Sequence, residues 1–128
     1  MNLNVNNGVK INLTKDFPFL LSRFWVHEFD LEKDEILIKD EAIEVLIYYF
    51  FPTAVIECSN IKNKGGFTRF KLVECLYNTI IRLYNRLDNL DIGIFGIKFK
   101  DLVIDDIIFF PKIKRINVSV ASIEEIVK

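Results

Sequence analysis

The strongest periodic pattern in the chain lies between residues 68 and 87, where apolar side chains recur at helical spacing. They form one stripe with two tyrosines beside it: Val73, Leu76, Ile80, Leu83, Leu87, Tyr77 and Tyr84. Thr68 precedes the stripe and is suited to cap a helix, and mostly polar residues occupy the opposite side. About twenty residues at 1.5 Å each predict a helix roughly 30 Å long, enough to cross a small domain.

The last third of the chain changes to a strand pattern that is rich in Ile, Val and Phe. Residues 102–110 and 114–120 predict two strands around a turn at residues 111–113. Apolar and polar residues alternate in the second of these strands, which is typical of a half-buried antiparallel strand. Residues 122–128 predict a short amphipathic end of one or two helical turns.

The first forty residues carry weaker signals. Alternation of apolar and polar residues predicts a short strand at residues 9–13. Asp16 is placed to cap a helical turn at residues 17–25, although crowded aromatic residues blur its period. Residues 36–38 predict another short strand after a polar turn.

A second helix is predicted where Asp40 and Glu41 precede apolar residues at helical spacing. These apolar residues are Ala42, Ile43, Leu46, Ile47 and Phe50. Pro52 should end this helix at the residue before it. Residues 53–58 are β-prone and predict a strand, and residues 59–66 predict a polar loop.

Together these elements predict an α+β fold over residues 1–128, a single soluble domain. One long central helix packs on a small, mostly antiparallel sheet that includes a C-terminal β-hairpin. With 51% apolar and 13% aromatic residues, 128 residues suffice for one core. The 17 basic and 18 acidic residues give a net charge of -1, which argues against disorder and against nucleic-acid binding by bulk charge.

Residue types that commonly carry catalysis or bind metals are sparse. Cys58 and Cys75 show no paired spacing, so we expect two free thiols that act as small buried apolar groups in a reducing, intracellular compartment. His27 is the only histidine, so we expect no catalytic residues, no metal site and no cofactor. The longest uncharged apolar stretch, residues 45–56, is too short to span a membrane as a helix, so we expect no membrane insertion.

Acidic residues gather near the first strand of the predicted hairpin. Asp101, Asp105 and Asp106 follow Asp88 and Asp91. Paired carboxylates are able to bind a divalent cation or to transfer protons, but these lack the spacing of a calcium loop. Neighbouring strand residues face opposite sides, so we expect Asp105 and Asp106 to point apart. A solvated strand edge, where charge discourages edge pairing, is the favoured interpretation.

An aromatic run offers the most useful hint about function. Tyr48, Tyr49, Phe50 and Phe51 are consecutive and cover all sides of the predicted helix end, and Trp25 adds to the aromatic content. A small domain with so many other aromatic residues has limited room to bury all of them. The run is therefore either core or a candidate protein interface.

Residues 66–69 (GFTR) and 93–96 (GIFG) begin two short motifs that resemble segments of a family of small proteins from nucleocytoplasmic large DNA viruses. Residues 66–69 read GFTR and lead to Leu72, as in the GFTR…L…Y segment of that family. Residues 93–96 and 101–104 read GIFG and DLVI, similar to its GIWGHDLxDLVL segment, and Ser122 matches its closing serine. The resemblance covers residues 66–122, and it implies a viral origin but no particular activity.

The departures from the family pattern remove polar chemistry. Ile97 and Lys98 stand where the family has His-Asp, Phe95 replaces a tryptophan, and Lys71 replaces an acidic residue at the helix start. The apolar and glycine framework is retained. This pattern favours a structural role for the second motif.

Five motif positions are candidates for function: Thr68, Arg69, Gly93, Gly96 and Asp101. Thr68 and Arg69 are suited to an anion or partner site at the helix start, although an N-cap with an ion-paired arginine is the favoured interpretation. Glycines such as Gly93 and Gly96 allow a ligand near the backbone, but more often they permit a turn before a strand.

The function expected from the sequence is that of a non-enzymatic protein-interaction module. Such a module would be a minor structural component of a large DNA virus, or a factor that binds a viral or host protein, or a second copy, through the aromatic run. One alternative is a small enzyme or metal binder built on the aspartates. The other is a nucleic-acid-associated protein using two basic groups: Arg69, Lys71, Arg82 and Arg86, and Lys112, Lys114 and Arg115.

Overall fold

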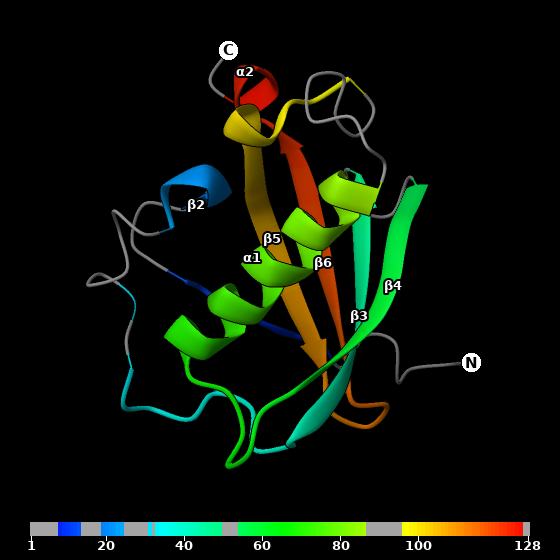
Figure 1. Ribbon diagram of the computed structural model, residues 1–128. Coiled ribbons are helices and arrows are strands. Elements are labelled where there is room, and N and C mark those ends of the chain that lie inside the picture. Colours follow the sequence, from blue (N-terminus) through cyan, green and yellow to red (C-terminus); the bar gives the residue numbers. More distant parts are fainter. Residues whose placement is uncertain are drawn as a thin grey trace.

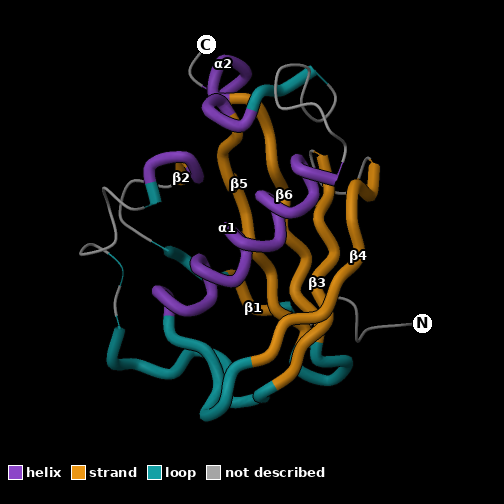
Figure 2. Tube along the Cα trace, viewed as in Figure 1, coloured by secondary structure: helices purple, strands orange, loops and turns teal. Residues whose placement is uncertain are grey.

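A computed structural model describes residues 8–13, 19–24, 31, 33–49, 54–86 and 96–126. One long helix crosses one face of a mixed six-stranded sheet (Figures 1 and 2). The elements are β1 Val9–Lys10, β2 Phe19–Leu20, η2 Leu21–Arg23, β3 Ala42–Tyr49, β4 Ala54–Lys62, α1 Arg69–Arg86, η4 Phe99–Asp101, β5 Leu102–Phe110, β6 Arg115–Ser122 and α2 Ile123–Ile126. The predicted α+β class is therefore confirmed.

The sheet has the strand order β1-β5-β6-β3-β4, and β2 also pairs with β5. β5 and β6 form the predicted C-terminal antiparallel hairpin. β3 and β4 are antiparallel as well, but β3 lies parallel to β6. The sheet is thus mostly antiparallel, with one parallel pair at its centre that joins two antiparallel halves.

The helix predicted after Asp40 and Glu41 is wrong, because Ala42–Tyr49 forms strand β3. Ile43, Val45 and Ile47 are buried, and their neighbours along the strand are more exposed. The apolar residues of this segment fit helical spacing and alternation equally well. Pairing with β4 on one side and β6 on the other decides for the strand, which also suits a segment rich in β-branched and aromatic residues.

Two other strands differ from their predicted boundaries or environment. β4 continues to Lys62, so the loop predicted from residue 59 begins four residues later. In β6, the polar residues Asn117 and Ser119 are buried together with the apolar ones, so this strand is not half-buried. β6 is the central strand, so the short side chains of Asn117 and Ser119 lie between longer side chains of β5 and β3.

The N-terminal predictions are met only in part. The strand predicted at residues 9–13 is regular over β1 alone, although the Ile11 amide still donates to the Ile107 carbonyl at 2.9 Å. Within the helical turn predicted at residues 17–25, Leu21–Arg23 forms the 3-10 helix η2 and Phe19–Leu20 forms the strand β2, and residues 14–18 and 25 lie outside the described part. Of residues 36–38, Ile38 forms a single bridge to Phe67.

The predicted long helix is confirmed as α1, which packs its apolar stripe on the sheet. Its buried residues are Leu72, Val73, Leu76, Thr79, Ile80, Leu83 and Tyr84. We call the side of the sheet that meets α1 the core face, and the other side the outer face. The core face presents the buried residues of β3, β5 and β6: Ile43, Val45, Ile47, Leu102, Ile104, Ile107, Phe109, Ile116, Val118 and Val120.

The short C-terminal helix is confirmed as α2, which follows β6 directly. The Ser122 hydroxyl accepts a hydrogen bond from the Glu124 amide at 3.3 Å, and the Ser122 amide donates to the Glu125 carboxylate at 3.2 Å. Within the ranges that the structure describes, no helix has the length and apolar character needed to cross a membrane.

Candidate interaction surface

The GFTR motif connects β4 to α1, and its first two residues hold the chain against residues 37–39. Gly66 has a φ of +95°, and a Cβ at this position would collide with the Ile38 carbonyl oxygen. Phe67 is fully buried, and its amide donates to Ile38 at 2.8 Å while its carbonyl accepts from Leu37 at 2.8 Å. These two positions therefore have a structural explanation in the fold.

Thr68 and Arg69 start α1. The Thr68 hydroxyl accepts a hydrogen bond from the Lys71 amide at 3.1 Å, which is the predicted N-cap. The Arg69 guanidinium donates to the Asn12 carbonyl at 2.7 Å and pairs with Glu35 at 3.1 Å. Arg69 thus ties the helix start to two other segments, which supports the structural interpretation over an anion site.

The second motif packs against the C-terminal half of α1, and Gly93 lies outside the described residues. Gly96 has a φ of +77°, with open space where a Cβ would project, so its backbone conformation rather than crowding favours glycine. The buried Tyr84 hydroxyl donates to the Ile97 carbonyl at 2.7 Å, and Phe99 meets the Tyr84 ring edge-on at 5.5 Å. This motif therefore anchors the helix to the start of β5.

The aspartates do not form the predicted cluster. Asp101 belongs to η4, whereas Asp105 and Asp106 lie within β5, and Asp88 and Asp91 are outside the described residues. β5 is not a sheet edge, because β6 pairs with one of its sides and β1 and β2 pair with the other. The prediction of a solvated strand edge is wrong for this reason.

A β-bulge brings Asp105 and Asp106 to the same face. The register between β5 and β6 shifts between Ile104 and Asp106, so Ile104 and Ile107 both face the core and the two aspartates between them face outward. Asp106 lies opposite Ser119, and the Ser119 hydroxyl hydrogen-bonds the Asp105 carboxylate. The expectation that the neighbours point apart is therefore wrong.

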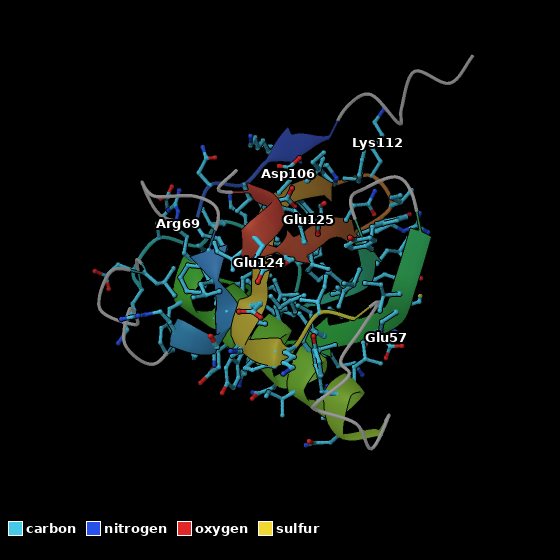
Figure 3. The ribbon with its side chains drawn as sticks, turned by 90° about the horizontal axis from the view of Figure 1, so that it is seen from above. Glu57, Arg69, Asp106, Lys112, Glu124 and Glu125 are labelled. Atoms are coloured by element: carbon cyan, nitrogen blue, oxygen red, sulfur yellow. The ribbon has the colours of Figure 1, made fainter. Side chains whose placement is uncertain are left out.

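These carboxylates lie in a partly buried polar cluster of the outer face. Burial raises the pKa of Asp105, and the Ser119 hydroxyl offsets part of that increase. The Lys10 ammonium is 3.9 Å from Asp106, which Figure 3 shows beside β1 on the side of the sheet away from α1. One buried carboxyl or amide oxygen on each of Asp105, Asp106 and Asn117 accepts no hydrogen bond from the described residues.

The rest of the outer face mixes apolar and polar side chains. Cross-strand pairing places Leu46 beside Asn117, Asn117 beside Ile108, and Tyr48 beside Ser119. Phe110 follows Ile108 on the same face. We call four half-buried side chains the outer-face patch: Leu46, Tyr48, Ile108 and Phe110.

The aromatic run is divided between the two faces. Tyr48 belongs to the outer face, whereas Tyr49 lies opposite Val120 on the core face and its hydroxyl donates to Glu125 at 3.0 Å. Burial raises the pKa of Tyr49, and the neighbouring Glu125 carboxylate adds to this effect. Phe50, Phe51 and Trp25 lie outside the described residues. The run ends a strand, not a helix as predicted.

The basic side chains do not form one surface. On α1, Lys71 pairs with Glu74 at 2.6 Å, and Arg82 contacts the Thr79 hydroxyl at 3.4 Å. In the hairpin, Lys114 lies 3.8 Å from Asp40, and Arg115 pairs with Glu44 at 2.7 Å, which holds the pKa of Glu44 below its usual value. Figure 3 shows Arg69 and Lys112 on different sides of the molecule. The side chain of Arg86 is outside the described part.

Cysteine and metal chemistry find little support in the described part of the chain. No group of three or more His, Cys, Asp and Glu residues there is arranged to hold a metal ion, and His27 falls outside it. Cys58 and Cys75 are free thiols. Burial raises the pKa of Cys75, whereas partial desolvation by its neighbours and the nearby Glu44 carboxylate raise the pKa of Cys58. Cys58 is exposed on β4, so the expectation that both thiols are buried is wrong for this one.

Comparisons with known proteins add no assignment: no family model, curated protein or solved structure matches the chain. The site must therefore be judged from its geometry. Of the outer-face patch, Tyr48 belongs to the predicted aromatic interface, whereas Leu46, Ile108 and Phe110 are not among the predicted residues. The patch combines β3 with β5, and the sequence pattern of β3 predicts a helix. Alternation of residues 43, 45 and 47 with 44, 46 and 48 was the signal available for finding the patch.

Proposed function

We propose that the chain is a non-enzymatic protein-interaction module that binds its partner through the outer-face patch. The observation that carries this proposal is the contrast between the two sides of the sheet. α1 covers the core face, whereas no helix in the described ranges packs on the outer face (Figure 3). Leu46, Tyr48, Ile108 and Phe110 are each only half-buried there. A partly exposed surface that combines apolar and aromatic side chains with polar ones, here Asn117 and Ser119 of β6 between them, is typical of a protein contact.

The surroundings of the patch suit an interface. Arg115 and Glu44 form an ion pair beside Phe110, and the Asp106–Lys10 pair lies beside Ile108. Interfaces commonly combine an apolar centre that includes aromatic residues with a polar rim. Binding would bury the patch and leave these ion pairs at its margin. Because the buried contact is apolar, salt should have little influence on its strength.

The viral setting forms part of the same proposal. Its basis is the resemblance of residues 66–122 to small proteins of large DNA viruses. In that setting the module serves as a minor particle component, or it binds a viral or host protein. The proposal is preferred over nucleic-acid binding because Arg69, Lys71 and Arg115 are already paired with carboxylates. It is preferred over an enzyme because Asp101 is separate from Asp105 and Asp106.

The experiment is affinity purification of the tagged chain from its native source in low and high salt, followed by mass spectrometry. We expect a stoichiometric protein partner that persists in high salt. Tyr48→Glu places a charge within the patch and should abolish capture. Asn78→Glu is the matched control, because Asn78 is exposed on α1, which packs on the core face and not on the side of the patch.

Thermal unfolding monitored by circular dichroism accompanies both variants, so that loss of binding is separated from loss of folding. The proposal is contradicted if folded Tyr48→Glu retains the partner. It is also contradicted if the wild-type chain recovers nucleic acid that is released by salt, or a bound small molecule or metal, with no stoichiometric protein. Recovery of salt-released nucleic acid would favour nucleic-acid binding through the basic groups. Recovery of a small molecule or metal would favour an enzyme or metal binder.

A further inference from the structure

Strand β4 ends the sheet, and the hydrogen bonds of its neighbours show which of its backbone groups point outward. The Asn63 amide donates to the Glu41 carbonyl at 2.8 Å, toward β3. Successive residues of an antiparallel strand direct their N–H and C=O groups alternately to the two sides. The backbone N–H and C=O groups of residues 57, 59 and 61 therefore bond to β3. The same groups of Cys58, Asn60 and Lys62 point away from β3.

Strand β3 gives the same result independently. Asn60 lies opposite Glu44, but the Glu44 amide donates to the Lys114 carbonyl at 2.9 Å, on the β6 side. The Asn60–Glu44 pair is thus a non-hydrogen-bonded pair, and the backbone groups of Asn60 point outward. No strand among the described residues pairs with this side of β4.

The three outward-pointing residues also have exposed side chains: Cys58, Asn60 and Lys62. They carry a single charge among them, on Lys62. Unpaired backbone groups on a nine-residue edge strand form a template for pairing with another strand. Natural edge strands are often protected by closely spaced charges, which this stretch of β4 lacks.

We propose that β4 is the contact of a symmetric dimer, in which it pairs antiparallel with β4 of a second copy, centred on Asn60. The three outward-pointing residues are evenly spaced about Asn60, so they are self-complementary. Asn60 lies opposite Asn60 of the second copy, and Cys58 lies opposite its Lys62. Each of these pairs exchanges two backbone hydrogen bonds. Any other register leaves one of the three residues opposite the irregular start of β4 or the turn that follows it.

The side chains support a second copy as the occupant. In this register no like charges are opposite each other, and the two Asn60 amides are able to hydrogen-bond. Lys62 of the second copy lies beside Cys58, whose thiol is 3.6 Å from the Glu44 carboxylate. Lys62 therefore brings a positive charge toward Glu44 of the other chain, and the two-fold axis repeats this contact.

The dimer is independent of the proposed function and extends it. A two-fold axis normal to the sheet keeps the outer faces of both copies on the same side. The two sheets become continuous through β4, and both outer-face patches face one way. A partner would then meet two patches side by side.

The first test is sedimentation equilibrium of the full chain under reducing conditions, with the Asn60→Pro variant as comparison. We expect the wild-type chain to sediment as a dimer and Asn60→Pro as a monomer. Proline removes an N–H that bonds to no strand in the described ranges, so β4 should still pair with β3. Circular dichroism checks that the variant is folded.

A second test does not depend on proline being tolerated. Asn60→Cys in a Cys58→Ser, Cys75→Ser background places one thiol on the two-fold axis. Hydrogen-bonded antiparallel pairs have Cα atoms about 5.5 Å apart, within the range of disulfides. Mild oxidation should yield a covalent dimer. Asn78→Cys in the same background is the matched control, because Asn78 is exposed on α1 and should not cross-link.

The outcomes separate this proposal from the proposed function. A chain that is monomeric at every concentration overturns the dimer and leaves the partner capture unaffected. A dimer that persists in Asn60→Pro and does not cross-link at position 60 also overturns the β4 contact. If that dimer is lost in Tyr48→Glu instead, the second copy occupies the outer-face patch.

Discussion

The two faces of the sheet are built from the same strands but have different compositions. On the core face, Ile47 and Val118 are neighbours and are almost completely buried beneath α1. One position along each strand, Leu46 and Asn117 are neighbours on the outer face, which also holds Asp105, Asp106 and Ser119. The core face is closed by the chain's own helix, whereas the outer face combines half-buried apolar side chains with polar ones, of which Asn117 and Ser119 are buried.

Under the proposed function, this difference separates stability, on the core face, from partner binding, on the outer face. The core face contributes most of the apolar burial that opposes the loss of chain entropy on folding. The outer face contributes less to that balance, so it can hold desolvated carboxylates and apolar side chains that a partner would cover. Substitutions on the two faces should therefore have different effects, and four predictions test this.

The largest effect is expected for Ile47→Ala, on the core face. Removing three carbons from a fully buried position should cost about 2–5 kcal/mol of the free energy of unfolding. Leu46→Ala removes as many carbons from the adjacent, half-buried outer-face position and should cost about 1 kcal/mol. Urea denaturation measures both. Equal losses would show that the outer face is as well packed as the core face.

The next effect tests a polar contact within the core. Tyr84→Phe removes the hydroxyl that donates to the Ile97 carbonyl and leaves a buried acceptor unsatisfied, which should cost about 1–2 kcal/mol. Tyr49→Phe is the comparison, because its hydrogen bond to Glu125 is only partly buried and should be worth less. Thermal unfolding of both variants provides the measurement, and a larger loss for Tyr49→Phe would argue against this order.

A smaller effect concerns the start of the helix that closes the core face. Thr68→Ala removes the acceptor of the Lys71 amide and should reduce stability by about 1 kcal/mol. Thr68→Ser retains the hydroxyl and should restore most of that loss. Hydrogen exchange at the Lys71 amide distinguishes the cap from a general effect, since its protection should fall only in the alanine variant.

The smallest effect is a pH dependence on the outer face. Burial raises the pKa of folded Asp105 above its unfolded value, so its contribution to stability is present below the unfolded pKa and is lost as pH rises through the folded pKa. Asp105→Asn removes that penalty and should raise the free energy of unfolding at pH 7 more than at pH 3. Urea titrations at both pH values test this.

Asp106→Asn is the matched control for this prediction. It breaks the exposed pair with Lys10, whose contribution should be below about 1 kcal/mol, and it should bring no gain at pH 7. A gain of the same size from both substitutions would assign the effect to net charge rather than to the burial of Asp105.

The elements that sequence analysis identified correctly are those whose signals are local. The N-cap Thr68 and the apolar stripe of α1 need only helical periodicity, and the β5–β6 hairpin needs only two apolar runs around a turn. The roles of Gly66 and Phe67 depend on Ile38, nearly thirty residues away, so the motif could be noticed but not explained.

The failures share a physical cause. Residues 42–49 satisfy both helical and strand periodicity, and only their partners in β4 and β6 decide between them. The bulge that turns Asp105 and Asp106 to one face is a property of the pairing with β6 rather than of β5 itself. The outer-face patch exists only if residues 42–49 form a strand, so predicting them as a helix concealed it.

Periodicity, capping and composition act over short stretches of chain, and they were enough to predict the α+β class, the long helix, the hairpin and the scarcity of residues for catalysis or metal binding. The tertiary structure alone decided that β3 is a strand parallel to β6, that two aspartates share the outer face, and that β4 directs three residues outward. These features depend on which segments become neighbours, since hydrogen bonding and burial between distant residues override local preference.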